Sequence, residues 1–77
     1  MIEIFLFAQL QETIGKQKIE APLAGKTIAE VKEWLVKEYP LISLTQAMTA
    51  VNEEFARDNH IVNDRDTIAF IPPISGG

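Results

Sequence analysis

The sequence contains no cysteine, a single histidine and no long apolar run. Without cysteine the chain can form no disulfide, no Cys/His zinc cluster and no thiol nucleophile, so we expect no bound metal. Basic residues are also few, with seven Lys and Arg against eleven Asp and Glu, and the net charge is −4. This balance argues against nucleic acid and against an anionic membrane surface as partners.

No segment is long enough to cross a bilayer, and the apolar start of the chain lacks the basic lead-in of a signal peptide. These absences make the cytoplasm the expected compartment. The chain has 77 residues, of which 47% are hydrophobic. This predicts one small globular domain, near the lower size limit for a core that has no disulfide or metal to stabilise it.

Two strands are expected near the start of the chain. Residues 2–8 alternate, with Ile2, Ile4, Leu6 and Ala8 on one face and Phe5 and Phe7 on the other. Residues 9–14 suit a short helical turn that ends at Gly15. A second strand over residues 17–23 then predicts an antiparallel hairpin with the first.

The most distinct element is a helix that begins after Thr27. Thr27 and Glu30 form the sequence pattern of a capping box, and Ile28, Val31 and Leu35 recur at helical spacing. Pro40 ends the helix, because the residue before a proline avoids the α conformation. Trp34 is interpreted as a half-buried packing residue at the side of this stripe.

The second half of the chain predicts further strands over residues 48–55, briefly over 61–62, and over 67–71, with a turn at 63–66. The resulting order, ββαβ(β)β, predicts an α+β fold: a mixed sheet of about four to five strands with one main helix packed on one face. We expect a domain over residues 1–71, followed by a flexible tail over 72–77.

The tail has a composition suited to entering another protein. Pro72 and Pro73 favour an extended exit from the last strand, and Gly76 and Gly77 have no Cβ to block a narrow channel. A Gly-Gly end is also what many frayed termini look like, so this feature alone does not decide the function. A carboxylate such as that of Gly77 needs activation as an acyl-adenylate before a sulfur or amine nucleophile can attack it. The chain has no phosphate-binding loop, so the ATP must be used by a partner.

Three stretches together resemble a known family. They are Phe7-Ala8-Gln9-Leu10-Gln11-Glu12, then Ala50-Val51-Asn52 with Asp64 and Asp66, and finally Ile68-Ala69-Phe70-Ile71-Pro72-Pro73-Ile74-Ser75-Gly76-Gly77. The chain resembles the small, sulfur-carrying subunit of molybdopterin synthase, one of the ubiquitin-like sulfur carriers, over essentially its whole length. One departure lies in the turn, which in many relatives reads Asp-Gly-Asp and here has Arg65. A positive φ at Arg65 would cost about 1 kcal/mol relative to glycine.

The resemblance implies a β-grasp fold and a set of partners. Gly77 would be adenylated by an E1-like activating enzyme and converted to a thiocarboxylate. The tail of residues Pro72, Pro73, Ile74, Ser75 and Gly76 would then deliver the sulfur inside the large synthase subunit. Two deliveries would turn cyclic pyranopterin monophosphate into molybdopterin, in a heterotetramer with two copies of each subunit. The chain itself would bind no cofactor and would not be an enzyme by itself.

Phe7, Phe55 and Ile71 are the candidate partner interface. One helix covers one face of the sheet, and strand alternation places Phe7 on the other face, which stays open unless a partner covers it. Phe55 and Ile71 sit late in their strands, where they could join Phe7, and the resemblance implies that partners dock through hydrophobic residues at these positions. Packing under the loop of residues 41–46, or exposure of Phe5 in place of Phe7, is the alternative for each residue taken alone.

Other polar residues have plainer interpretations. His60 reads as a solvated loop residue, Glu53-Glu54 and Asp64/Asp66 as surface and turn carboxylates, and Lys16 with Lys18 as solubilising charges. Rival functions are a sulfur carrier for thiamine or another product, a protein modifier joined to lysines through Gly77, and an interaction module with an inert tail.

Overall fold

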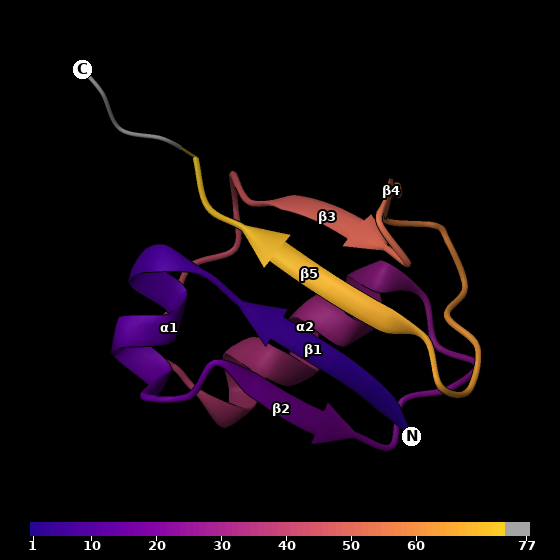
Figure 1. Ribbon diagram of the computed structural model, residues 1–77, viewed down its shortest axis with the longest axis horizontal. Helices are drawn as coiled ribbons and strands as arrows, with labels where there is room; N and C mark the ends of the chain where they lie inside the picture. The colour runs from indigo at the N-terminus through magenta and orange to yellow at the C-terminus, as the bar shows by residue number, and fades with distance from the viewer. Residues whose placement is uncertain (74–77) are drawn as a thin grey trace.

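The structure is a computed structural model that describes residues 1–73 of the chain (Figure 1). The strands form one sheet in the order β2-β1-β5-β3-β4. Their bounds are β1 Ile2–Leu6, β2 Lys18–Ala21, β3 Met48–Val51, β4 Glu54–Phe55 and β5 Thr67–Ile71. β5 is central, parallel to β1 and antiparallel to β3. The expected mixed sheet is confirmed.

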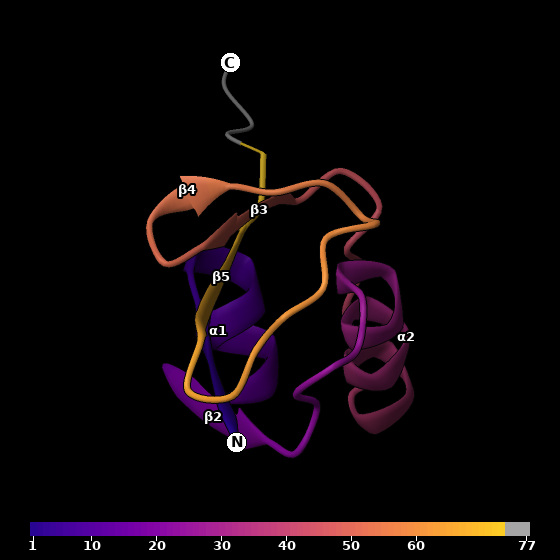
Figure 2. The same cartoon turned by 90° about the vertical axis from the view of Figure 1, so that its right-hand side faces the viewer.

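One long helix, α2 (Ile28–Glu38), lies across one face of this sheet, and no helix of residues 1–73 lies across the opposite face (Figure 2). A short helix, α1 (Ala8–Ile14), connects β1 to β2 at one end of the sheet (Figure 1). The core fills the space between α2 and the sheet. Its fully buried side chains include those of Ile2, Ile4, Leu6, Ile28, Val31, Leu35, Ile68 and Phe70. Burying each such side chain contributes about 1.5–3 kcal/mol.

Local chemistry sets the bounds of α2 as predicted. The Thr27 hydroxyl accepts a hydrogen bond from the Glu30 backbone N–H at 3.2 Å, and the Glu30 carboxylate accepts one from the Thr27 N–H at 3.0 Å. This capping box satisfies amides that a helix start otherwise leaves unpaired. The helix ends at Glu38, two residues before Pro40.

The prediction of one strand over residues 48–55 is wrong. The chain reverses at Asn52 and Glu53, which have φ of 51° and 72°, so β3 and β4 form a two-residue hairpin. Positive φ at both central residues is typical of a type I′ turn, which usually carries glycine. No glycine stands here, and the alternating pattern continues through the turn. As a result Val51 is buried, Glu53 lies in the turn and Phe55 is exposed.

Two further boundaries differ from the prediction. Ala8 does not extend the buried face of β1; it begins α1 with a φ of 50° and is exposed. β1 and β2 pair antiparallel as expected. The short helical turn predicted over residues 9–14 is α1, and it ends at the left-handed Gly15 as expected. The brief strand expected at residues 61–62 is an isolated bridge between Ile61 and Thr27.

Candidate functional site

The tail begins at the end of the central strand. Ile71 closes β5, Pro72 is half-buried beside α1, and Pro73 is exposed. Because Ile68 and Phe70 of the same strand are fully buried, the fold fixes the point from which the tail leaves. The remaining predicted tail residues, Ile74, Ser75, Gly76 and Gly77, lie outside the described residues.

The face of the sheet opposite α2 carries two apolar rows, which follow from the strand register. Phe5 pairs with Ala69, Ala69 with Ala50, and Ala50 with Phe55. Directly opposite residues point to the same side of a sheet, so these four form one row. Next to it, Met48 pairs with Ile71, and Phe7 stands one register step beyond the Leu6–Phe70 pair. We call this surface the open face.

All three predicted interface residues are exposed on this side of the molecule. Phe7 is 45% exposed, Ile71 37% and Phe55 73%. Phe7 and Ile71 lie at the same end of neighbouring strands, beside the base of the tail. Phe55 lies on the edge strand β4, separated from β5 by β3, so it belongs to the far side of the open face.

Met48 is an exposed apolar residue of the open face that the sequence interpretation did not single out. It is 50% exposed and sits directly opposite Ile71. The pairing of β3 with the end of β5 places Met48 beside the tail, and that pairing cannot be read from the sequence of residues 48–55 alone. Phe5, the alternative to Phe7, is half-buried.

A groove lies on the other side of the tail base, between α1 and the loop of residues 41–47. Its lining residues are neutral side chains and both prolines: Gln9, Leu10, Thr13, Leu41, Ile42, Ser43, Thr45, Gln46, Ala47, Pro72 and Pro73. Leu41 is 89% exposed, the highest value among the large hydrophobic residues of the described chain.

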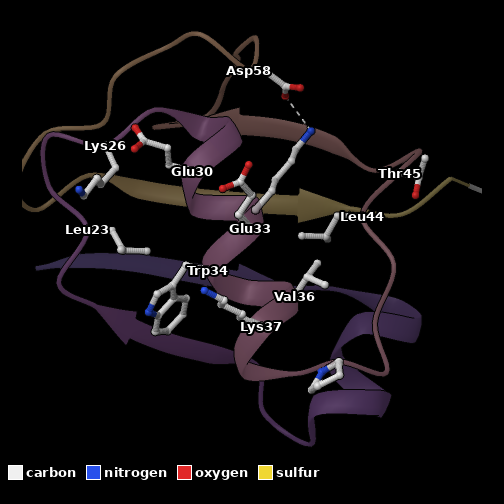
Figure 3. A pocket seen from close by; sticks show the side chains of 12 residues that line it. Leu23, Lys26, Glu30, Glu33, Trp34, Val36, Lys37, Leu44, Thr45 and Asp58 are labelled. Carbon is white, nitrogen blue, oxygen red and sulfur yellow. Dashed lines mark hydrogen bonds and ion pairs between the residues drawn. The ribbon is translucent and has the colours of Figure 1, made fainter.

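A second hollow follows the outer side of α2 (Figure 3). Trp34 lies at one side of this hollow, packed against the core as expected for a half-buried residue. Charged side chains of both signs surround it, and Lys32 is paired with Asp58 at 2.8 Å. A solvated helix face accounts for these features.

The carboxylates of the turn at residues 63–66 hold the backbone in place. Asp66 accepts hydrogen bonds from the Asn63 backbone N–H at 2.8 Å and from the Asn52 side-chain amide at 3.0 Å, and both lower its pKa. The N-terminal ammonium group binds Asp64, and this hydrogen bond and charge lower the pKa of Asp64. Both groups are ionised at neutral pH and serve the turn, which fits the interpretation of them as turn carboxylates.

Residues 1–73 contain no cluster of His, Cys, Asp and Glu side chains that could hold a metal ion. Within the same described range, no helix has the length and apolarity needed to cross a membrane.

The fold defines a class of protein, the ubiquitin-like β-grasp domains. In a structural comparison the chain superposes with a TM-score of 0.81 on the solution structure of the small archaeal modifier protein 1 from Methanosarcina acetivorans. That comparison covers 99% of this chain and 95% of the archaeal chain, at 25% sequence identity.

The family within this class follows from sequence. The model of the ThiS family matches residues 4–77, and the chain belongs to that family. It is 43% identical to the molybdopterin synthase sulfur carrier subunit of Dictyostelium discoideum, over 97% of this chain and 94% of that protein. The protein of the same name from Arabidopsis thaliana is 35% identical, over 99% of this chain and 82% of its own length.

Proposed function

We propose that this chain is the sulfur carrier subunit of a molybdopterin synthase and that the carboxylate of Gly77 is its working group. The observation that carries the proposal is the 43% identity, over nearly the full length of both chains, to a protein of that name. The fold supports it, because the tail leaves from the end of a buried central strand and is flanked by exposed apolar residues.

The proposed chemistry takes place at the terminal carboxylate. One carboxylate oxygen attacks the α-phosphorus of ATP on an activating enzyme, pyrophosphate leaves, and Gly77 becomes an acyl-adenylate. A sulfide-level nucleophile then attacks the carbonyl carbon, and AMP departs with the former carboxylate oxygen. The product is a thiocarboxylate, which can be carried safely because the chain has no cysteine with which it could react.

The proposed partners are the large synthase subunit and the E1-like adenylyltransferase. The large subunit would supply the substrate pocket, the catalytic groups and the cyclic pyranopterin monophosphate site. The open face is the proposed docking surface, with Phe7, Met48 and Ile71 around the tail base and Phe55 at its far side. Phe7, Met48 and Ile71 expose apolar side chains next to one another, a pattern typical of an interface centre.

A second candidate function is that of a protein modifier, in which an amine displaces AMP and Gly77 forms an isopeptide bond to lysine. The likeness to the small archaeal modifier protein 1 favours this candidate. Both functions begin with the same acyl-adenylate, so the identity of the nucleophile separates them.

The experiment is intact-mass analysis of the purified chain after incubation with its activating enzyme, ATP and sulfide. A mass gain equal to the replacement of one oxygen by sulfur, located at Gly77 by fragmentation, is the expected result. Adding the large subunit and cyclic pyranopterin monophosphate should then return the carboxylate form and yield molybdopterin.

Two variants control the experiment. A chain with one alanine added after Gly77, and a chain that lacks Gly77, should keep the thermal unfolding profile of the original and deliver no sulfur. Sulfur delivery by the extended chain would show that the terminal carboxylate is not the reactive group. Lysine-linked conjugates in place of the thiocarboxylate would favour the modifier, and an unchanged mass would refute both candidates.

A further inference from the structure

Charged side chains are unevenly distributed along this chain. They make up 23% of its residues, yet residues 4–11, 39–52 and 67–77 contain none. Every Asp, Glu, Lys and Arg falls in residues 1–3, 12–38 or 53–66. Such gaps in a small acidic protein need a structural explanation, because an exposed surface is normally where charge is placed.

The fold brings one part of each uncharged segment together at one end of the molecule (Figure 1). β1 and β5 are parallel, so both deliver their C-terminal ends there, and the antiparallel β3 begins there. α1 starts at the same end, and the tail base follows β5. We call this end the neutral pole and define it by residues 7–11, 41–48 and 71–73.

The neutral pole is uncharged on both sides of the tail. Phe7, Met48 and Ile71 of the open face stand on one side. On the other side runs the groove between α1 and the loop of residues 41–47, whose lining holds amides, hydroxyls and apolar groups but no ionisable side chain. Leu41 projects from the rim of this groove with 89% of its surface exposed.

The contrast with the rest of the surface is sharp. The hollow along α2 is lined by charged residues of both signs (Figure 3): Lys26, Glu30, Lys32, Glu33, Lys37 and Asp58. An uncharged surface around the tail base lowers solubility unless something covers it. Interface centres, in turn, are depleted of charge because desolvating an unpaired charge is expensive.

We infer that the large synthase subunit encloses the neutral pole on both sides of the tail, so that Leu41 and the groove form a second contact beside the open face. This inference rests on the proposed function and extends its docking surface around the tail base. A protein that draws the tail into a channel must also contact the surface around the tail base. The neutral pole forms that surface, and covering it requires no charged side chain to be desolvated.

The large subunit is favoured over a second copy of this chain as the occupant. Two chains packed pole against pole would bury both tails against each other and withhold Gly77 from any enzyme. The groove's neutral donors and acceptors, such as Gln9, Thr13 and Gln46, suit the backbone of a partner loop, whose groups carry no net charge.

The test introduces one negative charge at the groove and one at a distant site. Leu41→Asp and Ile61→Asp each replace an exposed aliphatic side chain, with 89% and 55% exposure, and change the net charge by the same amount. Gln9→Glu is a nearly isosteric second groove variant, in the first turn of α1, where a negative charge is favourable for folding. Circular dichroism should show native folding for all three.

Affinity for the purified large subunit is measured by isothermal titration calorimetry, and terminal sulfur by intact mass. Leu41→Asp and Gln9→Glu should weaken binding by tenfold or more, while Ile61→Asp stays within twofold of the original chain. All variants should still accept sulfur at Gly77.

The possible failures are distinguishable. If the original chain binds the large subunit and the groove variants bind it equally well, the open face alone is the interface and the inference is wrong. If the original chain neither accepts sulfur nor binds the large subunit, the proposed function itself fails and the inference falls with it. A concentration-dependent dimer in sedimentation that Leu41→Asp abolishes would assign the groove to a second copy and overturn the inference.

Discussion

Arg65 is a residue whose chemistry conflicts with its backbone conformation. Its φ of 70° lies in the left-handed region, where a Cβ crowds the following carbonyl oxygen. The positive φ whose cost was considered for Arg65 from the sequence is therefore present. The turn keeps this conformation because its backbone is held from outside: the Arg65 N–H donates to the Met1 carbonyl at 2.8 Å.

We therefore expect Arg65→Gly to raise the free energy of unfolding by about 0.5–1 kcal/mol, the relief of strain less the extra freedom of glycine in the unfolded chain. Urea denaturation measures the change. Gly25→Ala is the reverse control: Gly25 has a φ of 88° and open space around a built Cβ, so alanine should cost about 1–2 kcal/mol through conformation alone. No gain in Arg65→Gly would mean that the Arg side chain itself stabilises the turn.

Asp66 links this turn to the β3–β4 hairpin. Hydrogen bonds from the Asn63 N–H and the Asn52 amide lower its pKa in the folded state, and Asn52 in turn accepts one from the Thr67 N–H at 3.0 Å. A carboxylate with a lowered folded-state pKa contributes stability that is complete above its unfolded pKa of about 3.9. That contribution is lost as the pH falls through the lower folded value.

Asp66→Asn should accordingly be less stable than the original chain at pH 7 and should lose less stability between about pH 4 and pH 2. Thermal unfolding across that range measures both effects. Glu12→Gln, which removes an exposed carboxylate of α1, is the matched control and should follow the profile of the original chain. If Asp66→Asn loses as much stability as the original chain between about pH 4 and pH 2, the carboxylate of Asp66 does not have the stabilising role assigned to it.

At the scale of elements, the sequence predicted best where a local signal has one interpretation. α2 begins at its capping box and ends before Pro40, because both signals act through backbone chemistry within a single turn. The β3–β4 hairpin was missed, because Asn52-Glu53 lacks the glycine that normally marks such a turn. A hydrogen bond between the Asn52 side-chain amide and the Asp66 carboxylate holds the reversal without a glycine. Such a long-range contact cannot be read from the local sequence.

The cap of α2 gives a prediction at this scale. Thr27→Ala should lower the free energy of unfolding by about 0.5–2 kcal/mol, because the Glu30 N–H loses its acceptor at the start of the helix. Chemical denaturation measures the loss. Thr27→Ser keeps the hydroxyl and should recover most of the stability, whereas equal losses in both variants would trace the effect to the methyl group of Thr27.

At the scale of the whole molecule, one face of the sheet is uncovered because there are more sheet faces than long helices to cover them. Residues 1–73 contain one long helix, which can cover only one of the two faces of the sheet, so the other face stays open. The sequence could predict this and could place Phe7, Phe55 and Ile71 on the open face. It could not place Met48 or Leu41 near the tail, since both positions depend on the sheet register and on the path of the loop of residues 41–47.

The open face gives the docking prediction. Phe7→Ala and Ile71→Ala should each weaken binding of the large subunit by about 1–3 kcal/mol, if they are central anchors of the interface. Titration calorimetry with the purified partner measures the loss. Ile61→Ala, at an exposed position bridged to Thr27 at the start of α2, should leave the affinity unchanged. Unaltered binding in the two open-face variants would return Phe7 and Ile71 to a packing role.

The position of β5 also has a mechanical consequence. The tail continues a central strand that is held by β1 on one side and β3 on the other. A pull on the tail along the strand therefore loads both ladders of hydrogen bonds in shear, all at once, whereas an edge strand would be peeled away bond by bond. A force on the tail along the strand must therefore break many hydrogen bonds at once before the domain unfolds.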